Sequence, residues 1–220
     1  MSEKPLSFTE LQIQRRAKAH ENRLIFVGLV GYAKSGKDTI AALMTEYIRV
    51  AFADALKSDI LKIFQDTIPA GYSMDTWMSE NKEVLRPLLV EYGRAKRAFN
   101  PMYWVERAAR ERMLLGRTKG RFVFTDVRYP NEVAWLTGMF NARIFRIFRD
   151  SNQPANAEEA KSITDILNGR PEIETIYNPE GKPEEAAKRI IEIVDPEPEY
   201  EVSKNRRMGK RAAAKLLEEP

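Results

Sequence analysis

The sequence predicts an α/β fold in which a parallel sheet carries helices on both faces. Short apolar runs rich in β-branched and aromatic residues alternate with segments whose apolar residues recur at helical spacing. A glycine-rich turn joins the first of these runs to the first helical segment, and an aspartate ends a later run. Strands that alternate with helices in this way are typical of a parallel sheet covered on both sides.

Composition narrows the class of protein. A chain of 220 residues is long enough for one domain with a full core, and 43% hydrophobic with 31% charged residues is typical of a soluble globular protein. The net charge of +4 suits an anionic ligand as well as a nucleic acid. The absence of cysteine excludes disulfides and thiolate metal sites, and a single histidine, His20, cannot build a histidine metal cluster. Because no apolar run has the length of a membrane span and no signal peptide is recognisable, we expect a cytoplasmic protein without a membrane partner.

The first strand, expected at 24–30, leads into a loop that fits the pattern G-x-x-x-x-G-K, from Gly31 through Gly36 to Lys37. This is the spacing of the phosphate-binding loop (P-loop) of nucleoside-triphosphate enzymes. Its glycines let backbone N–H groups curl towards a polyphosphate, the following helix adds its free N–H groups, and the lysine supplies a point charge. We therefore predict a P-loop three-layer sandwich that binds a polyphosphate through Gly31, Ala33, Ser35, Gly36, Lys37, Asp38 and Thr39.

Asp38 stands where such loops usually carry serine or threonine. A carboxylate there can hold Mg²⁺ directly or through water, so we expect a magnesium site at Asp38. The alternative is a strand–helix turn that contains glycine and binds nothing.

The remaining elements follow from periodicity and from turn residues. We expect a helix that continues through residue 48, a strand at 49–54, a helix at 55–65, a mobile segment at 67–82, helices at 85–93 and 102–115, and a strand at 121–126. A short helix at 130–137, strands at 142–148 and 173–177, and a helix at 183–194 complete the fold, with a polar lid at 150–170. Residues 67–100 are predicted to form a mobile acceptor-binding segment within a domain that spans 24–195.

Two segments flank this predicted domain. Residues 1–23 are polar and predict an extension with a helix at about 9–19. The tail, residues 196–220, carries six basic residues and no acidic one between Lys204 and Lys215. This run can contact nucleic acid, but short charge runs are usually solvated, and we favour a solvated tail.

The strand at 121–126 ends in Asp126, and Arg128 and Glu132 follow it. A carboxylate at the carboxyl end of a parallel strand lies where ligands of open α/β folds bind, so Asp126 is placed to orient Mg²⁺ or its waters. Arg128 can clamp a phosphate, and Asn131 and Glu132 can hydrogen-bond a sugar or base. The alternative is that Asp126 caps the following turn and that Arg128 pairs with Glu132 on the surface.

Cations gather further along the predicted crevice. Arg86, Arg94, Lys96 and Arg97 flank one helix, and phosphoryl transfer between two anionic substrates needs such charges. A solvated basic face is the alternative for this group. Arg149 and Arg170 bracket the predicted lid, and Asp54 and Lys57 are candidates to line an acceptor pocket.

Taken in order, the segments GYAKSGKDT, FADALK, RPLLVEYGRAKRAFNPMYWVERA and FTDVRYPNE resemble those of phage-type deoxynucleoside monophosphate kinases. The resemblance extends over about residues 24–194, and GKDT together with DVRYPNE is its most specific part. It implies that the γ-phosphoryl group of ATP is transferred to a deoxynucleoside monophosphate (dNMP), with ATP and Mg²⁺ as cofactors. The location would then be the host cytoplasm, and dimers are common among such enzymes.

The resemblance also implies roles for individual residues. Lys37, Asp126 and Arg128 would carry catalysis, Arg149 would join the loop in binding ATP, and Asp38 with Asp126 would hold magnesium. The monophosphate would be held by Asp54, Lys57, Arg86, Arg94, Arg128 and Glu132. Two alternatives stay open: a P-loop kinase of another phosphorylated metabolite, of the dephospho-coenzyme A or phosphomevalonate type, and a P-loop module that binds ATP or nucleic acid through its tail.

Overall fold

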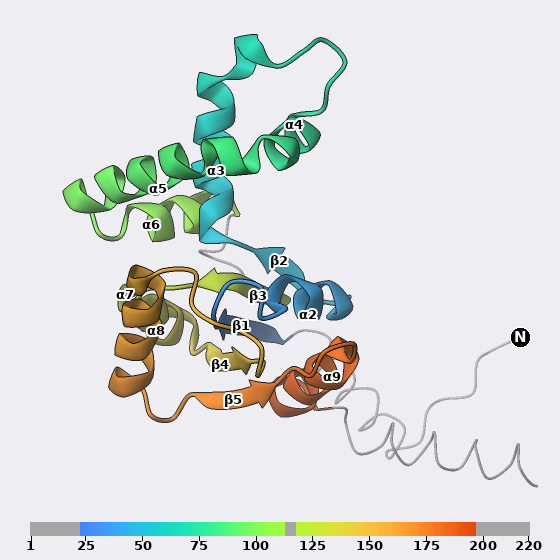
Figure 1. The fold of residues 1–220 in the computed structure, drawn as a ribbon. Helices are drawn as coiled ribbons and strands as arrows, with labels where there is room; N and C mark the ends of the chain where they lie inside the picture. Colours follow the sequence, from blue (N-terminus) through green and yellow to red (C-terminus); the bar gives the residue numbers. More distant parts are fainter. Residues whose placement is uncertain (1–22, 113–117, 197–220) are drawn as a thin grey trace, which may run out of the picture.

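A computed structural model describes residues 23–112 and 118–196. It confirms the predicted α/β class, with a central sheet of five parallel strands in the order β2-β3-β1-β4-β5 (Figure 1). The strands are β1 (Leu24–Val30), β2 (Ile48–Val50), β3 (Gly120–Val127), β4 (Arg143–Phe148) and β5 (Glu174–Tyr177). The first strand is central, so the loop that follows it leaves the middle of the sheet at its carboxyl edge.

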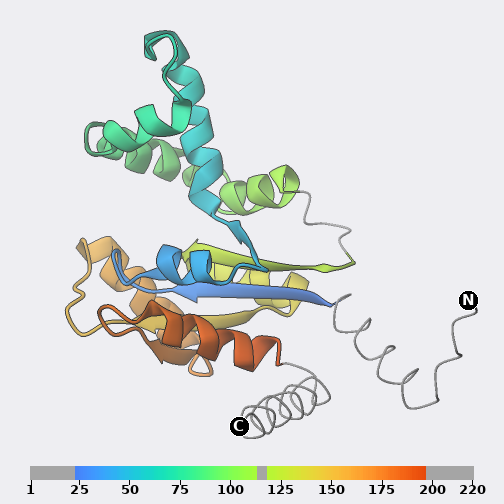
Figure 2. The same ribbon diagram turned by 90° about the vertical axis from the view of Figure 1, so that its right-hand side faces the viewer.

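Helices cover both faces of the sheet and extend beyond one edge. They are α2 (Lys37–Leu43), α3 (Phe52–Ile63), α4 (Met74–Glu80), α5 (Lys82–Phe99), α6 (Tyr103–Glu111), α7 (Pro130–Phe140), α8 (Ala157–Gly169) and α9 (Pro183–Val194), with a 3₁₀ turn at Gln65–Thr67. Figure 2 shows α3, α4, α5 and part of α6 rising from the β2 edge of the sheet as a helical lobe. No helix among the described residues is both long enough and apolar enough to span a membrane.

The alternation of side chains along β1 explains the three layers. Val27 and Leu29 point into a core shared with α2 and α9, while Phe26 and Val30 point into a second core shared with α3, α6, α7 and α8. Successive strand residues face opposite sides, so a continuous apolar run buries both faces of the sheet. Gly28 lies on the second face, where an added Cβ would come within 2.6 Å of Ile144 Cδ1.

Two predicted boundaries around the first helix are wrong. The helix was expected to continue to residue 48, but α2 ends at Leu43 and Ile48 already belongs to β2. Met44 and Tyr47 are nevertheless buried in the same core as Ile40. The helical spacing of apolar residues therefore extends beyond the end of the helix itself. The strand expected at 49–54 is only three residues long, because α3 begins at Phe52.

The helical lobe is more ordered in secondary structure than its composition indicated. Residues 67–82, predicted as a loop, contain α4, which the Ser73 side chain caps by accepting the N–H of Thr76. Helix α5 continues through Gly93, where a helix end was predicted. Gly93 lies at a close helix contact: its carbonyl accepts the indole N–H of Trp104, and an added Cβ would lie 3.4 Å from Leu56. Gly93 therefore allows close packing between helices and does not end α5.

The C-terminal elements agree closely with expectation. Strand β4, strand β5 and helix α9 lie within one residue of the predicted bounds, and α7 continues three residues further than predicted. The predicted lid at 150–170 divides into two parts, a segment at 150–156 and α8, which packs on the sheet through Ile163 and Ile166. The helix expected at 9–19, the end of the helix at 102–115 and the basic tail lie outside the described residues.

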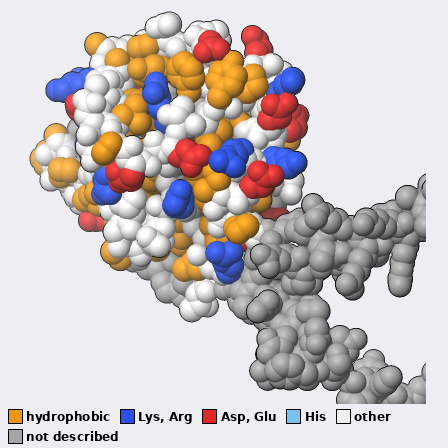
Figure 3. Space-filling view, turned by 90° about the horizontal axis from the view of Figure 1, so that it is seen from below, with side chains coloured by type: hydrophobic (Ala, Val, Ile, Leu, Met, Phe, Trp, Pro, Cys, Tyr) orange, Lys and Arg blue, Asp and Glu red, His pale blue; other side chains and the backbone are white. Residues whose placement is uncertain are grey.

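Charges of both signs are interspersed on the face of the molecule opposite the helical lobe. Figure 3 shows this face, on which Lys and Arg side chains alternate with Asp and Glu and no broad patch of one sign forms among the described residues. This face gives no support to a polyanion-binding surface.

Candidate functional site

The loop at residues 31–37 is a tight turn that only glycine fits at two positions. Gly31 has φ of 156° and Gly36 has φ of 93°, and an added Cβ would lie 2.5 Å from the Ile147 carbonyl oxygen at the first and 2.3 Å from Asn178 Nδ2 at the second. Both positions therefore combine positive φ with close approach of other backbone and side-chain atoms. The loop connects β1 to the N-terminus of α2, the location where helix N–H groups favour an anion.

Lys37 is buried at the start of α2 and holds the loop closed. Its Nζ donates hydrogen bonds to the carbonyl oxygens of Gly31, at 2.6 Å, and Tyr32, at 2.7 Å, and to Ser35 Oγ, at 3.3 Å. Burial, followed by the nearby charge of Arg128, lowers the pKa of Lys37 to about 8. The ammonium is thus poised inside the loop, and an anion that entered would be attracted to a charge with few competing waters.

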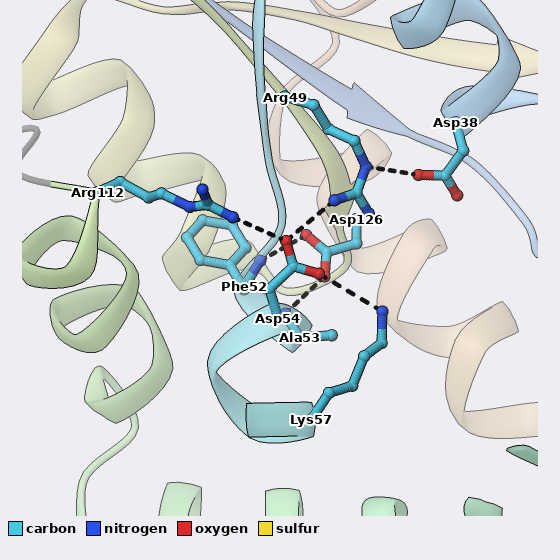
Figure 4. Close-up of polar contacts among 8 residues, drawn as sticks. All are labelled: Asp38, Arg49, Phe52, Ala53, Asp54, Lys57, Arg112 and Asp126. Carbon is cyan, nitrogen blue, oxygen red and sulfur yellow. Dashed lines mark hydrogen bonds and ion pairs between the residues drawn. The ribbon is translucent and has the colours of Figure 1, made fainter. Parts of the chain in front are cut away.

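Asp38 is held by a cation. Figure 4 shows Arg49 between Asp38 and Asp54, with distances of 3.2 Å from Nε to Asp38 Oδ1 and 3.0 Å from Nη1 to Asp54 Oδ2. Asp54 also contacts Lys57 and Arg112. The second oxygen of Asp38 makes none of these contacts, and the side chain is 73% exposed.

Asp126 ties the sheet to the helical lobe. Its two oxygens accept the backbone N–H groups of Phe52 and Ala53, each at 2.8 Å, at the first turn of α3 (Figure 4). Burial raises the pKa of Asp126, while the two N–H groups and the charge of Arg128 favour its carboxylate. Asp126 therefore caps a helix, as the alternative interpretation held, but the helix is α3 and not the turn that follows β3.

These contacts bear on the expected magnesium site. Within residues 23–112 and 118–196 no group of three or more acidic or histidine side chains could hold a metal ion by itself. Mg²⁺ in kinases is usually held by one or two carboxylates, with substrate phosphates and waters as the other ligands. The exposed Asp38, which Arg49 contacts through Oδ1, and the remaining lone pairs of Asp126 fit that kind of coordination.

A pocket of about 280 Å³ lies between the helical lobe and helices α7 and α8, with loop residue Ala33 at its wall. Of the predicted acceptor residues, its lining includes Lys57, Arg86, Arg128 and Glu132, and it also includes Asp126, which was predicted for catalysis and magnesium binding. Its lining also includes cations, aromatic and apolar side chains that were not assigned to the acceptor site: Lys82, Arg97, Trp104, Tyr129, Leu56 and Leu89. A cavity that combines apolar walls with convergent charges is the usual form of a small-molecule site.

Arg128 and Glu132 do not pair with each other. Oε2 of Glu132 accepts the backbone N–H groups of Arg128, at 2.7 Å, and Tyr129, at 3.0 Å, at the start of α7. Burial, reinforced by the charge of Asp126, raises the pKa of Glu132 to about 8. The Arg128 side chain is exposed, and its guanidinium makes no ion pair or hydrogen bond with the residues described, so its charge is available to a ligand.

Three predicted residues lie beside the pocket rather than in its wall. Asp54 is engaged in the network around Arg49, and Arg94 pairs with Glu91 and with Glu158 of α8, at 3.1 Å. Arg149 lies at the loop, with Nε donating to the Asn178 carbonyl at 3.3 Å. At the far end of α8, Arg170 pairs with Glu172 and takes no part in this site.

Sequence reasoning missed two residues that contact the loop. Asn178, which follows β5, is fully buried and donates from Nδ2 to the Ser35 carbonyl at 2.7 Å. Glu159 of α8 accepts the backbone N–H of Ala33 at 3.0 Å. Each contact joins residues more than a hundred positions apart. Asn178 directly follows the strand predicted at 173–177, whereas nothing in the sequence singled out Glu159.

The pocket also contains a stacked pair that was not assigned. The guanidinium of Arg97 lies 4.6 Å from the centre of the Tyr129 ring, and the Tyr129 hydroxyl donates to Glu158 at 3.2 Å. Arg97 had been noted only as one of several basic residues on a helix.

No protein-family model matches this chain, and a search of curated proteins finds no match to it.

Proposed function

We propose that this protein is a deoxynucleoside monophosphate kinase that transfers the γ-phosphoryl group of ATP to a dNMP and releases dNDP and ADP. The observation that carries the proposal is the pocket next to the glycine-rich loop, whose lining combines cations with an aromatic wall. Such a kinase needs one site for a polyphosphate and a second, adjoining site for an anionic nucleotide. The ordered set of segments quoted above, which resembles the phage-type kinases, agrees with this proposal.

On the donor side, the loop at 31–37 would hold the triphosphate of ATP. Lys37 would exchange its three internal acceptors for β- and γ-phosphate oxygens, and the N–H groups at the start of α2 would add to the anion site. Arg149 lies beside Gly36 and would contact the same nucleotide. Mg²⁺, with Asp38 and Asp126 reaching it directly or through water, would supply neutralisation of phosphate charge.

On the acceptor side, the charges of Lys57, Arg86 and Arg128 would hold the 5′-phosphate and oppose the charge that develops during transfer. The Arg97–Tyr129 pair would offer a flat face for a base, and the buried Trp104, whose indole N–H is satisfied by Gly93, would support the apolar wall behind it. These side chains bind and orient the substrate, and no covalent intermediate with the protein is required.

The test is an assay of ADP production with Mg²⁺ and ATP against the four dNMPs, their ribonucleotide counterparts and modified pyrimidine monophosphates. We expect turnover with one or a few deoxynucleotides. Lys37→Ala should lower kcat by at least about a hundredfold, because it removes a charge that stabilises the transferring group. A circular-dichroism spectrum of that variant would check that it remains folded.

The same assay separates the rival functions. Activity only with dephospho-coenzyme A, phosphomevalonate or a similar phosphorylated metabolite would retain the kinase chemistry and replace the acceptor. ATP binding without any turnover, together with nucleic-acid binding that falls steeply with salt and is lost when residues 197–220 are deleted, would favour a binding module. A kinase should keep its activity after that deletion.

A further inference from the structure

A carboxylate of the protein itself lies against the glycine-rich loop. Glu159 Oε1 accepts the N–H of Ala33 at 3.0 Å, and its Oε2 accepts the N–H of Ala155 at 2.7 Å. Asn152 donates from Nδ2 to the carbonyl of the same Ala33 at 2.8 Å. Both backbone groups of one loop residue are therefore held by the segment that precedes α8 and by its first turn.

In this contact the Glu159 carboxylate brings to the loop the negative charge that a bound anion would bring. The charge of Glu159 raises the pKa of Lys37 against the effect of burial, so the carboxylate and the ammonium act on each other inside the loop. A backbone N–H of a glycine-rich loop that faces a buried lysine is the type of donor that a phosphate oxygen uses.

We infer that Glu159 occupies the place of a phosphate oxygen at the loop, so that a nucleotide must displace it to bind. The inference rests on the proposed function and adds a regulation of the donor site: an internal anion that competes with ATP. A protein whose binding-competent form is only partly populated shows a weaker apparent affinity by that fraction.

The surroundings of Glu159 allow this displacement without loss of the helix. Asn156 caps α8 by accepting the backbone N–H of Glu159 at 2.8 Å, so the start of the helix does not depend on the Glu159 side chain. Ile163 and Ile166 anchor α8 in the core below the sheet edge. The movement that the inference requires is thus limited to one side chain and the short segment at 150–156.

The experiment compares Glu159→Gln with Asp165→Asn by calorimetric titration with inorganic tripolyphosphate and with ATP, both without Mg²⁺. Asp165 is an exposed carboxylate on the same helix and forms no hydrogen bond or ion pair with the described residues of the loop. Its substitution changes the net charge by the same amount. Glu158 is unsuitable as the control because it contacts Arg94 and Tyr129 beside the acceptor pocket.

We expect Glu159→Gln to bind both ligands about tenfold more tightly, which corresponds to about 1.4 kcal/mol, and Asp165→Asn to stay within about twofold of the wild type. Asn152→Ala removes the hydrogen bond to the Ala33 carbonyl without changing the net charge. It should give a smaller gain in affinity for both ligands. Thermal unfolding of each variant verifies that it is folded at the temperature of the titration.

The outcomes separate this inference from the proposed function. Equal affinities of the wild type and Glu159→Gln, or an equal gain in Asp165→Asn, would overturn the internal competitor while leaving the kinase proposal in place. If no variant binds either ligand, the nucleotide site itself is wrong, and both proposals fall. Tighter binding by Glu159→Gln in a protein that phosphorylates no dNMP would uphold the competitor and overturn only the assigned acceptor.

Discussion

Lys37 and Glu132 are two ionisable side chains whose pKa values burial moves in opposite directions, to about 8 in each case. Burial makes the charged ammonium of Lys37 less favourable, and it disfavours the charged carboxylate of Glu132 more strongly. One lies in the glycine-rich loop and the other lines the adjacent pocket. Because both pKa values lie near 8, the net charge of the loop and the pocket changes with pH close to neutrality. Groups that titrate in this range are common in functional sites.

Glu132 has a consequence for stability that can be measured. Its pKa is 4.5 in an ordinary environment and about 8 in the folded protein, so between these values the folded state retains a proton that the unfolded state has lost. The stability that this proton contributes is fully present below pH 4.5 and is lost as the pH rises through 8. Gln mimics the protonated acid at every pH, because its carbonyl can accept the same two backbone N–H groups.

We therefore expect Glu132→Gln to match the wild type within about 1 kcal/mol near pH 5 and to exceed it by about 2 kcal/mol or more above pH 8. Urea unfolding over this range measures the difference. The exposed Glu180 supplies a control, Glu180→Gln, which makes the same charge change at the surface and should stay within about 0.5 kcal/mol of the wild type. Parallel stability curves for Glu132→Gln and the wild type would show that Glu132 is ionised in the folded protein.

At the scale of elements, the junction of β3 with α3 depends on Asp126. The carboxylate accepts the N–H groups of both Phe52 and Ala53, and these donors begin the helix that carries part of the wall of the pocket. Negative charge at a helix N-terminus is favourable, and hydrogen bonds to a charged group contribute more than neutral ones. Asp126 thus positions α3 as well as facing the magnesium site we propose.

Asp126→Asn should lower the free energy of unfolding by about 2 kcal/mol, because the amide NH₂ faces one of the two N–H donors and leaves it unpaired. Urea unfolding measures this loss. Asp75→Asn, a change at the exposed first turn of α4, is the matched control and should cost less than about 0.5 kcal/mol. Unchanged stability of Asp126→Asn, combined with a loss of turnover, would instead assign Asp126 a role in catalysis alone.

The elements differ in how well the sequence alone predicts them. Strands β1 and β3 are buried on both faces and bounded by turn residues, so an apolar run indicated each within one or two residues. Residues 67–82 and Gly93 were misinterpreted because proline and glycine usually break helices, whereas here Gly93 serves the contact with Leu56 and Trp104. Local residue preferences cannot reveal such a contact between helices.

The same reasoning explains which parts of the site could be predicted. The loop and the Asp126–Arg128 stretch are local patterns that lie next to strand ends, and the structure brings both to one edge of the sheet. The partners of the loop come from elsewhere: Glu159 lies 126 positions from Ala33, and Asn178 lies 143 from Ser35. Neither residue belongs to a motif, so only the folded arrangement identifies them.

The whole molecule consists of a sheet layered with helices and a helical lobe with a small core of its own, formed by Ile60, Leu61, Met78 and Leu85. The lobe is joined to the sheet through β2 and α3 (Figures 1 and 2). The lining of the pocket comes from both parts. A ligand that reached from the loop into the pocket would therefore contact the sheet, α8 and the lobe together.

This arrangement predicts the effect of a bisubstrate compound, in which adenosine and a deoxynucleoside are joined through a pentaphosphate. Linking the two nucleosides makes the second binding event intramolecular, so the compound should bind more tightly than ATP or the dNMP. At a hundred times its Kd it should stabilise the protein by about 2.7 kcal/mol and raise Tm by about 5–10 °C.

Differential scanning fluorimetry measures this shift, and two controls define its origin. Adenosine pentaphosphate without the second nucleoside tests whether the extra charge alone suffices, and a compound with a triphosphate bridge tests whether the span between the loop and the pocket matters. A shift for the bisubstrate compound that merely equals the shift for adenosine pentaphosphate would mean that the pocket does not receive a nucleoside next to the loop. A larger shift that disappears with the shorter bridge would place donor and acceptor in the two adjoining cavities that phosphoryl transfer requires.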